Sequence, residues 1–170
     1  MPSQNINSIQ TLFQSRLETL EHLLKTAQIH FSNDESFLQK RIAPDMFPFG
    51  TQIVFTCNQP HNFALWCDGK PVDNLDPEVV SIVQAYEHIA NTKKLLSNIQ
   101  VEDEKLTEEI RLDLGEGLYA ELTGRVYVNE FLIPNFYFHL VTAYDILRMA
   151  GVAIGKKDYM MHLMPWVRKE

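Results

Sequence analysis

His139 is the side chain in this sequence whose type and surroundings come closest to a chemical role. It could act as a general base or as a metal ligand, with Tyr144 or Asp45 as a neighbour. The other interpretation is a buried histidine that forms a structural hydrogen bond within an aromatic core. Ala143 follows four residues later, so no second histidine extends the same helical face. His139 therefore indicates a candidate site without indicating a reaction.

Charged residues form a second candidate. Arg41, Asp45 and Arg148 could form an ionic network that positions an anionic ligand, because arginine offers a planar fork of donors. A purely structural network is the more common outcome. Lys156 and Asp158 allow the same two interpretations, of which ordering the end of the chain is preferred.

Pro60 marks a third candidate. An interior proline removes a backbone hydrogen bond and clashes with the preceding turn, so we expect a kink or break near residues 57–60. Asn58, Gln59 and His61 surround this point and could contact a ligand beside freed backbone groups. A tolerated local bend without a ligand explains the same pattern and is slightly preferred.

Aromatic residues are concentrated near His139. Phe136, Tyr137, Phe138 and Tyr144 could line a ligand pocket. However, such a run covers all sides of a helix, so some rings face the core and others face outward. We expect mainly core packing, with the exposed rings supporting a helix-to-helix homodimer.

Hydrophobic periodicity predicts the elements that carry these residues. Apolar residues recur at three- or four-residue steps over four segments, which predicts four long helices. The expected helices span residues 6–30, 48–67, 76–99 and 124–150. A short helical piece is expected before residue 42, and alternation around Gly115–Gly117 predicts a β-hairpin over residues 110–122.

Punctuating residues refine these boundaries. Ser3 or Asn5 could cap the first helix, and Asp76-Pro77-Glu78 predicts the start of the third. Pro134 predicts a bend in the last helix, and Gly151 predicts a left-handed cap at its end.

Composition limits the classes of function. The 170 residues suit one domain over positions 1–170, and the net charge of -7 disfavours nucleic-acid binding. The most apolar stretch, residues 126–147, carries too many polar residues for a membrane span. The first ten residues lack the basic head and apolar run of a signal peptide, so we expect a cytoplasmic protein.

Two blocks resemble the DinB/YfiT-like superfamily. The first is RIAPDMFP (Arg41–Pro48) with the following Gln52, and the second is PNFYFH-xx-TAY-x-ILR-xx-GV-x-IGK-x-D, which begins at Pro134. More narrowly, the chain resembles a bacterial subfamily of that superfamily with no assigned function. The resemblance implies an all-α fold, a DinB-like four-helix bundle with a small β-hairpin before the last long helix. It also suggests a homodimer.

Many members of the wider superfamily hold a divalent metal with one histidine on the second helix and two, four residues apart, on the fourth. Some act as metal-dependent transferases on low-molecular-weight thiols. By this resemblance His139 matches the subfamily histidine, Ala143 replaces its partner, and Asn58-Gln59 stand where relatives carry Asp-His. The sequence therefore does not support a three-histidine site.

Two hypotheses follow. The favoured one is a dimeric small-molecule-binding or non-catalytic bundle with an incomplete ancestral metal site and no assigned cofactor. The alternative is a metal-dependent, thiol transferase-like enzyme in which His139 binds zinc or nickel with unconventional ligands. The candidate ligand-binding residues are Asp45, Gln59, His61, His139, Tyr144 and Arg148.

Overall fold

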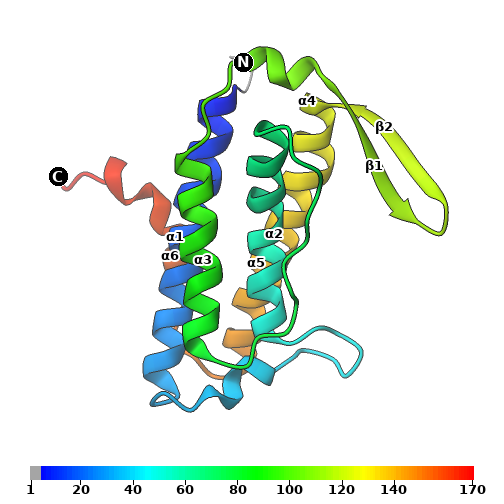
Figure 1. Ribbon diagram of the computed structural model, residues 1–170. Coiled ribbons are helices and arrows are strands. Elements are labelled where there is room, and N and C mark those ends of the chain that lie inside the picture. Colours follow the sequence, from blue (N-terminus) through cyan, green and yellow to red (C-terminus); the bar gives the residue numbers. More distant parts are fainter. Residues whose placement is uncertain (1–4) are drawn as a thin grey trace.

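Apolar faces of four long helices meet along one axis in the computed structural model, which describes residues 5–170 (Figure 1). The elements are α1 (Ile6–His30), η1 (Glu35–Gln39), α2 (Phe49–Cys67), α3 (Ile82–Ser97), η2 (Asp103–Thr107), β1 (Glu109–Gly115), β2 (Leu118–Thr123), α4 (Gly124–Val126), η3 (Tyr127–Leu132), α5 (Ile133–Met149), α6 (Lys156–Tyr159) and η4 (Met161–Trp166). The predicted bundle with a hairpin before the last long helix is confirmed.

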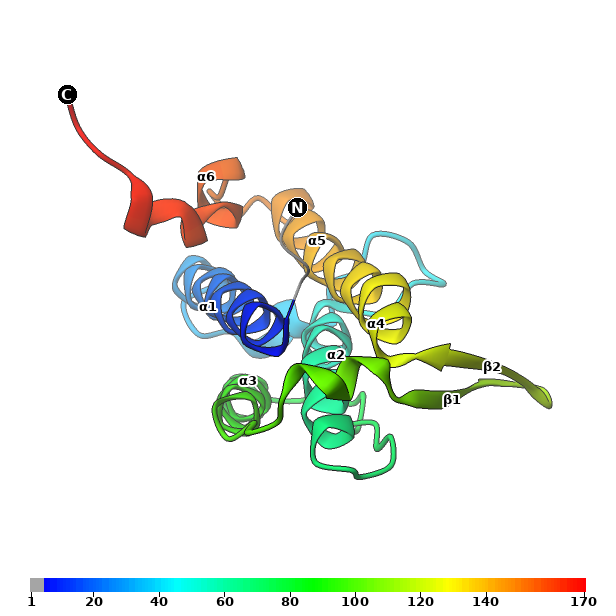
Figure 2. The ribbon, with the colours of Figure 1, turned by 90° about the horizontal axis from the view of Figure 1, so that it is seen from above.

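The bundle is not a simple alternation of up and down helices. α1 and α5 run in one direction, whereas α2 and α3 run in the other (Figure 1). Residues 68–81 form a strap that connects the end of α2 to the start of α3 by returning along the outside of α2 (Figures 1 and 2). α2 lies between α3 and α5 and packs against both, so its side chains occupy the centre of the core.

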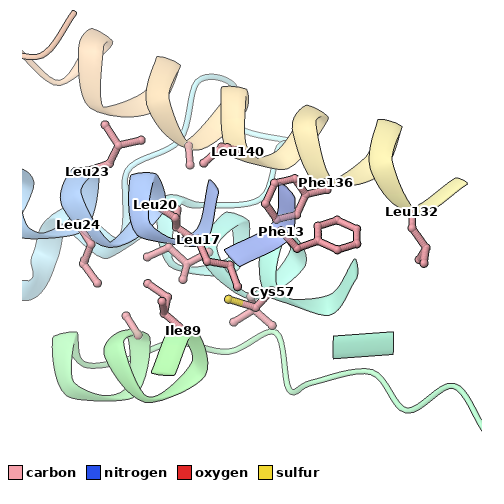
Figure 3. Close-up of a cluster of buried hydrophobic side chains, with 14 of the residues drawn as sticks. Phe13, Leu17, Leu20, Leu23, Leu24, Cys57, Ile89, Leu132, Phe136 and Leu140 are labelled. Carbon is pink, nitrogen blue, oxygen red and sulfur yellow. The ribbon is translucent and has the colours of Figure 1, made fainter. Parts of the chain in front are cut away.

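The predicted range of α1 is confirmed. Its N-cap is Asn5, whose side chain accepts a hydrogen bond from the Ser8 N–H at 2.8 Å, while the Ser8 hydroxyl accepts one from the Asn5 N–H at 3.0 Å. Ser3, the other predicted cap, lies outside the described residues. In the core, the rings of Phe13 and Phe136 pack edge to face with 5.1 Å between their centroids (Figure 3).

α3 begins later than the sequence predicts. The expected start at Asp76 is wrong, because the helix begins at Ile82 with Ser81 as its N-cap. The Asp76 side chain accepts a backbone hydrogen bond from Glu78 at 3.0 Å, but this closes a local turn within the strap.

Side chains of α2 hold the strap extended. The Asn58 amide oxygen accepts a hydrogen bond from the Leu75 N–H at 2.8 Å, and that of Asn62 accepts one from the Asp73 N–H at 3.1 Å. These buried amides satisfy backbone donors that a helix would otherwise use. Further along the strap, the Thr51 hydroxyl donates a hydrogen bond to the Pro77 carbonyl oxygen at 2.9 Å, so contacts with α2 continue into the segment where a helix was expected.

Pro60 does not break α2. The helix continues from Phe49 through Pro60 to Cys67, so of the kink or break expected near residues 57–60, the break is absent. Pro60 is buried, and α3 and α5 pack along α2 and hold its two halves together. Tertiary packing thus outweighs the single backbone hydrogen bond that proline removes.

Pro134 has a different effect in the last helix. α4, η3 and α5 form one continuous helix in which η3 has π-helical hydrogen bonds. This π segment immediately precedes α5, whose first turn contains Pro134, and such a widened turn accommodates a missing N–H without ending a helix. Gly151 has φ of 87°, which confirms the predicted left-handed cap.

The hairpin projects away from the bundle (Figure 2). β1 and β2 pair antiparallel with Ile110 opposite Leu122, as the alternation predicts. Within residues 5–170, no helix is both long and apolar enough to span a bilayer.

Candidate functional site

The candidate site is built from the first turn of α2 and the middle of α5. Gln52, which is buried, lies on α2, and its side-chain oxygen is 2.8 Å from His139 Nδ1. The Gln52 amide nitrogen donates a hydrogen bond to the Phe47 carbonyl oxygen at 3.2 Å. The residue-41–48 block and the last helix, which are separated in sequence, therefore meet through one side chain.

This network fixes the tautomer of His139. Because the Phe47 carbonyl can only accept, the NH₂ group of Gln52 must face it and the amide oxygen must face His139. His139 Nδ1 therefore carries the ring proton and donates a hydrogen bond to the Gln52 amide oxygen. The lone pair of the neutral ring is left on Nε2, the atom that would accept a hydrogen bond or bind a metal.

Aromatic rings surround the imidazole. The rings of Phe55 and Phe138 each lie 5.1 Å from that of His139, and Phe47 packs against Phe55 at 5.0 Å. Burial in this environment lowers the pKa of His139 to about 4. The ring is neutral at pH 7, which suits a hydrogen-bond acceptor.

The side chains present do not fit a three-histidine metal centre. Nδ1 is engaged by an amide, and buried Ala143 occupies the position one turn further along α5. Across residues 5–170, no three His, Cys, Asp or Glu side chains are grouped so that they could hold a metal ion. An amide oxygen beside one imidazole is a poor donor set for zinc or nickel.

The residues around Pro60 have partners of their own. The Gln59 amide donates to the Phe55 carbonyl oxygen at 3.1 Å. Asn58 holds the strap, as described above. His61 faces the strap as well: burial lowers its pKa, and nearby Asp73 opposes that effect. None of these groups makes a hydrogen bond with His139.

The predicted network of Arg41, Asp45 and Arg148 does not form. Arg41 donates to the Met46 carbonyl at 3.3 Å, Arg148 donates to the Ile154 carbonyl at 2.8 Å, and Asp45 is exposed. No ion pair within the described residues joins these three side chains. Both arginines instead satisfy backbone oxygens near loop ends, which is a structural role.

Tyr144 lies on α5 with His139 but contacts a different element. Its ring packs against Tyr159 of α6 with 6.0 Å between centroids. Asp158 orders this segment, because its carboxylate accepts a hydrogen bond from the Gly155 N–H and is 2.9 Å from His22 Nε2 on α1. The preferred interpretation of Asp158 is therefore confirmed.

Two cavities were not predicted from the sequence. One, of about 200 Å³, lies between α1, α5 and the C-terminal segment, and Arg16, Tyr137, Tyr159 and His162 contribute polar groups to it. The other, of about 370 Å³, lies where the ends of α2 and α3 meet. Only the aromatic composition of α5 was a signal for the first, since its remaining residues lie far apart in the chain.

The architecture, a four-helix bundle with a hairpin before the last long helix, defines the class as a DinB-like helical bundle. A crystal structure of a DinB family member protein from Shewanella denitrificans is similar, with 26% sequence identity and a TM-score of 0.76 over 92% of this chain and 96% of that chain. Residues 7–160 match the family described as "Domain of unknown function (DUF1993)", and the chain belongs to that family. No curated protein matches the sequence.

Proposed function

We propose that this protein is a homodimeric small-molecule-binding bundle that works without a metal centre at His139. The observation that carries the proposal is the hydrogen bond from His139 Nδ1 to the amide oxygen of buried Gln52. It assigns the imidazole a fixed tautomer and orientation. Both would be needed to accept a hydrogen bond from an N–H or O–H group of a ligand.

The chemistry of the surroundings supports binding rather than catalysis. A general base at neutral pH works best with a pKa near 7, whereas burial lowers that of His139 to about 4. The ring is therefore a weak base but a serviceable hydrogen-bond acceptor. The half-buried ring of Phe55 beside it, and the exposed ring of Phe47 that packs against Phe55, offer apolar contact area for a ligand.

The alternative, a zinc- or nickel-dependent thiol transferase-like enzyme, requires at least two further ligands at His139. Gln59 and His61 are engaged elsewhere on α2, and Asp45 is exposed in the preceding loop. No feature of the site specifically favours this alternative.

The experiment that separates the two is elemental mass spectrometry of untagged protein, before and after incubation with zinc or nickel. We expect substoichiometric metal in the wild type and in His139→Gln, a variant without the imidazole. Near-stoichiometric metal in the wild type that is lost in His139→Gln would refute the proposal and justify a thiol-transferase screen.

The homodimer is supported by the outer face of α5. Phe138, Val141 and Met149 are exposed there by 61%, 39% and 55%, and their spacing places them on one side of the helix. Exposed apolar stripes of this kind are typical of helix-to-helix interfaces.

The dimer can be tested by light scattering coupled to size exclusion. Phe138→Glu should produce monomers, because it would bury charge in the interface. Val83→Glu is a matched control, since Val83 is 65% exposed on α3, away from α5. A monomeric wild type, or a Phe138→Glu protein that remains dimeric, would contradict the homodimer. We further expect a cytoplasmic protein, in keeping with the free, buried Cys57 and Cys67.

A further inference from the structure

The cavity beside the C-terminal segment contains an arginine without a counter-ion. Arg16 is half-buried on α1, and its hydrogen bond is to the neighbouring Ser15 hydroxyl at 2.8 Å. The ion pairs of residues 5–170 are formed by other side chains. A half-buried guanidinium group without an anionic partner keeps donors that an anion from outside the chain can satisfy.

Three other polar atoms of the cavity lack hydrogen-bond partners within the described residues. No hydrogen bond within the described residues involves the phenol oxygen of Tyr137 or Tyr159, and His162 Nδ1 is buried without a partner. Arg16 lies near two of these groups: burial lowers the pKa of His162 and Arg16 lowers it further, while burial raises the pKa of Tyr159 and Arg16 opposes that rise. Several hydrogen-bonding groups thus converge on one small volume.

Charge and size define the kind of ligand. Arg16 supplies a single permanent positive charge, and the lowered pKa of His162 keeps that ring neutral at pH 7. One charge matches a carboxylate better than a phosphate dianion. The volume of about 200 Å³ is somewhat larger than a cavity of about 150 Å³ that accepts benzene, and Leu140 and Met160 supply apolar walls.

We propose that this cavity binds a small organic acid whose carboxylate pairs with Arg16. Tyr137 and Tyr159 donate hydrogen bonds to the carboxylate, and the apolar part of the acid packs against Leu140 and Met160. The site is separate from His139. The benzoate experiment below therefore tests this cavity alone. A negative result would leave the metal and homodimer tests of the proposed function unaffected.

Benzoate is a suitable probe because its ring and carboxylate match the walls and the charge. We would titrate it into protein labelled with carbon-13 at the methionine methyl groups and follow their NMR signals. The Met160 signal should shift with saturation, whereas that of Met46, in the loop before α2, should not. Benzamide, which has the same shape without the charge, should bind at least about tenfold more weakly.

Substitutions then assign the contacts. Arg16→Gln should weaken benzoate binding by about 10- to 100-fold, because a charge-assisted bidentate pair is lost. Tyr159→Phe removes one hydroxyl and should weaken binding by a few fold, so it provides a second test if Arg16→Gln unfolds. Thermal unfolding without ligand should be close to that of the wild type for Tyr159→Phe.

Three outcomes would overturn the proposal. The first is a Met160 signal that benzoate leaves unmoved at millimolar concentration, and the second is a folded Arg16→Gln protein that binds benzoate as tightly as the wild type. Inorganic phosphate that displaces benzoate and binds more tightly would refute the carboxylate class. A shift at Met160 that both Arg16→Gln and Tyr159→Phe weaken is the expected result.

Discussion

Acidification should destabilise the protein through His139 in a way that one substitution can isolate. The unfolded ring has the ordinary pKa of 6.5, whereas burial lowers the pKa of the folded ring to about 4. At pH values between about 4 and 6.5, His139 is therefore protonated in the unfolded chain but neutral in the native protein. The free energy of unfolding therefore falls as pH falls from about 6.5 towards 4, and it recovers as pH rises.

The magnitude follows from the two pKa values. At pH 4.5, proton linkage at this single ring would lower the free energy of unfolding by at most about 2.5 kcal/mol relative to pH 8. His139 is only partly buried, so solvent screening reduces the expected loss to about 1 kcal/mol. This remains large compared with the precision of a difference between two variants measured in parallel.

The assay is urea unfolding at pH 7.5 and pH 4.5 for the wild type and for His139→Gln. Burial also lowers the pKa of His61, His88 and His162, so both proteins should lose stability on acidification. The wild type should lose about 1 kcal/mol more than the variant, because only it has the ring at position 139.

Two results would refute this reasoning. Equal acid-induced losses in the wild type and His139→Gln would mean that the buried ring does not resist protonation. An NMR titration in which the His139 ring changes protonation near pH 6.5 would lead to the same conclusion. Either result would also weaken the case for a neutral acceptor at the candidate site.

Three further substitutions test the structure elsewhere. Gly124→Ala would place a Cβ against the Trp66 ring and should cost about 1–3 kcal/mol, visible as a lower melting temperature in calorimetry. Asn62→Ala removes two hydrogen bonds to the strap and should speed amide hydrogen exchange in the strap at pH 7. Exchange in the core of α1 should be unchanged and is the internal control. Burial alone would raise the pKa of Asp158, but hydrogen bonds from His22 and the Gly155 N–H outweigh it and lower that pKa. The stability that ionised Asp158 contributes is therefore present at neutral pH and is lost as pH falls through the lowered pKa. Asp158→Asn should speed hydrogen exchange in the C-terminal segment at pH 7. The difference in exchange from the wild type should shrink in acid.

Local signals predicted the elements wherever the fold agrees with them. The periodic apolar face of α1 and the Gly115–Gly117 turn each depend on neighbouring residues, and both appear where expected. Asp76-Pro77-Glu78 is an equally strong local signal, yet the Thr51 hydroxyl of α2 donates a hydrogen bond to the Pro77 carbonyl oxygen at 2.9 Å, and Asn58 binds the adjoining Leu75 N–H. Contacts between distant segments decide such cases, and a single sequence does not reveal them.

The partner of His139 illustrates the same limit for the site. α2 and α5 are antiparallel. Gln52 of α2 contacts His139 of α5, whereas Trp66, later in α2, contacts Tyr127 of η3, which precedes α5 in the same continuous helix. Residues 58–59 of α2 are therefore opposite a part of α5 that precedes His139 by about two turns. The sequence alone does not contain this register, which is why Asn58-Gln59 could be taken for the counterpart of His139. Gln52 belongs to the block that carries the family resemblance, and its position in the register makes it the residue that determines what His139 can do.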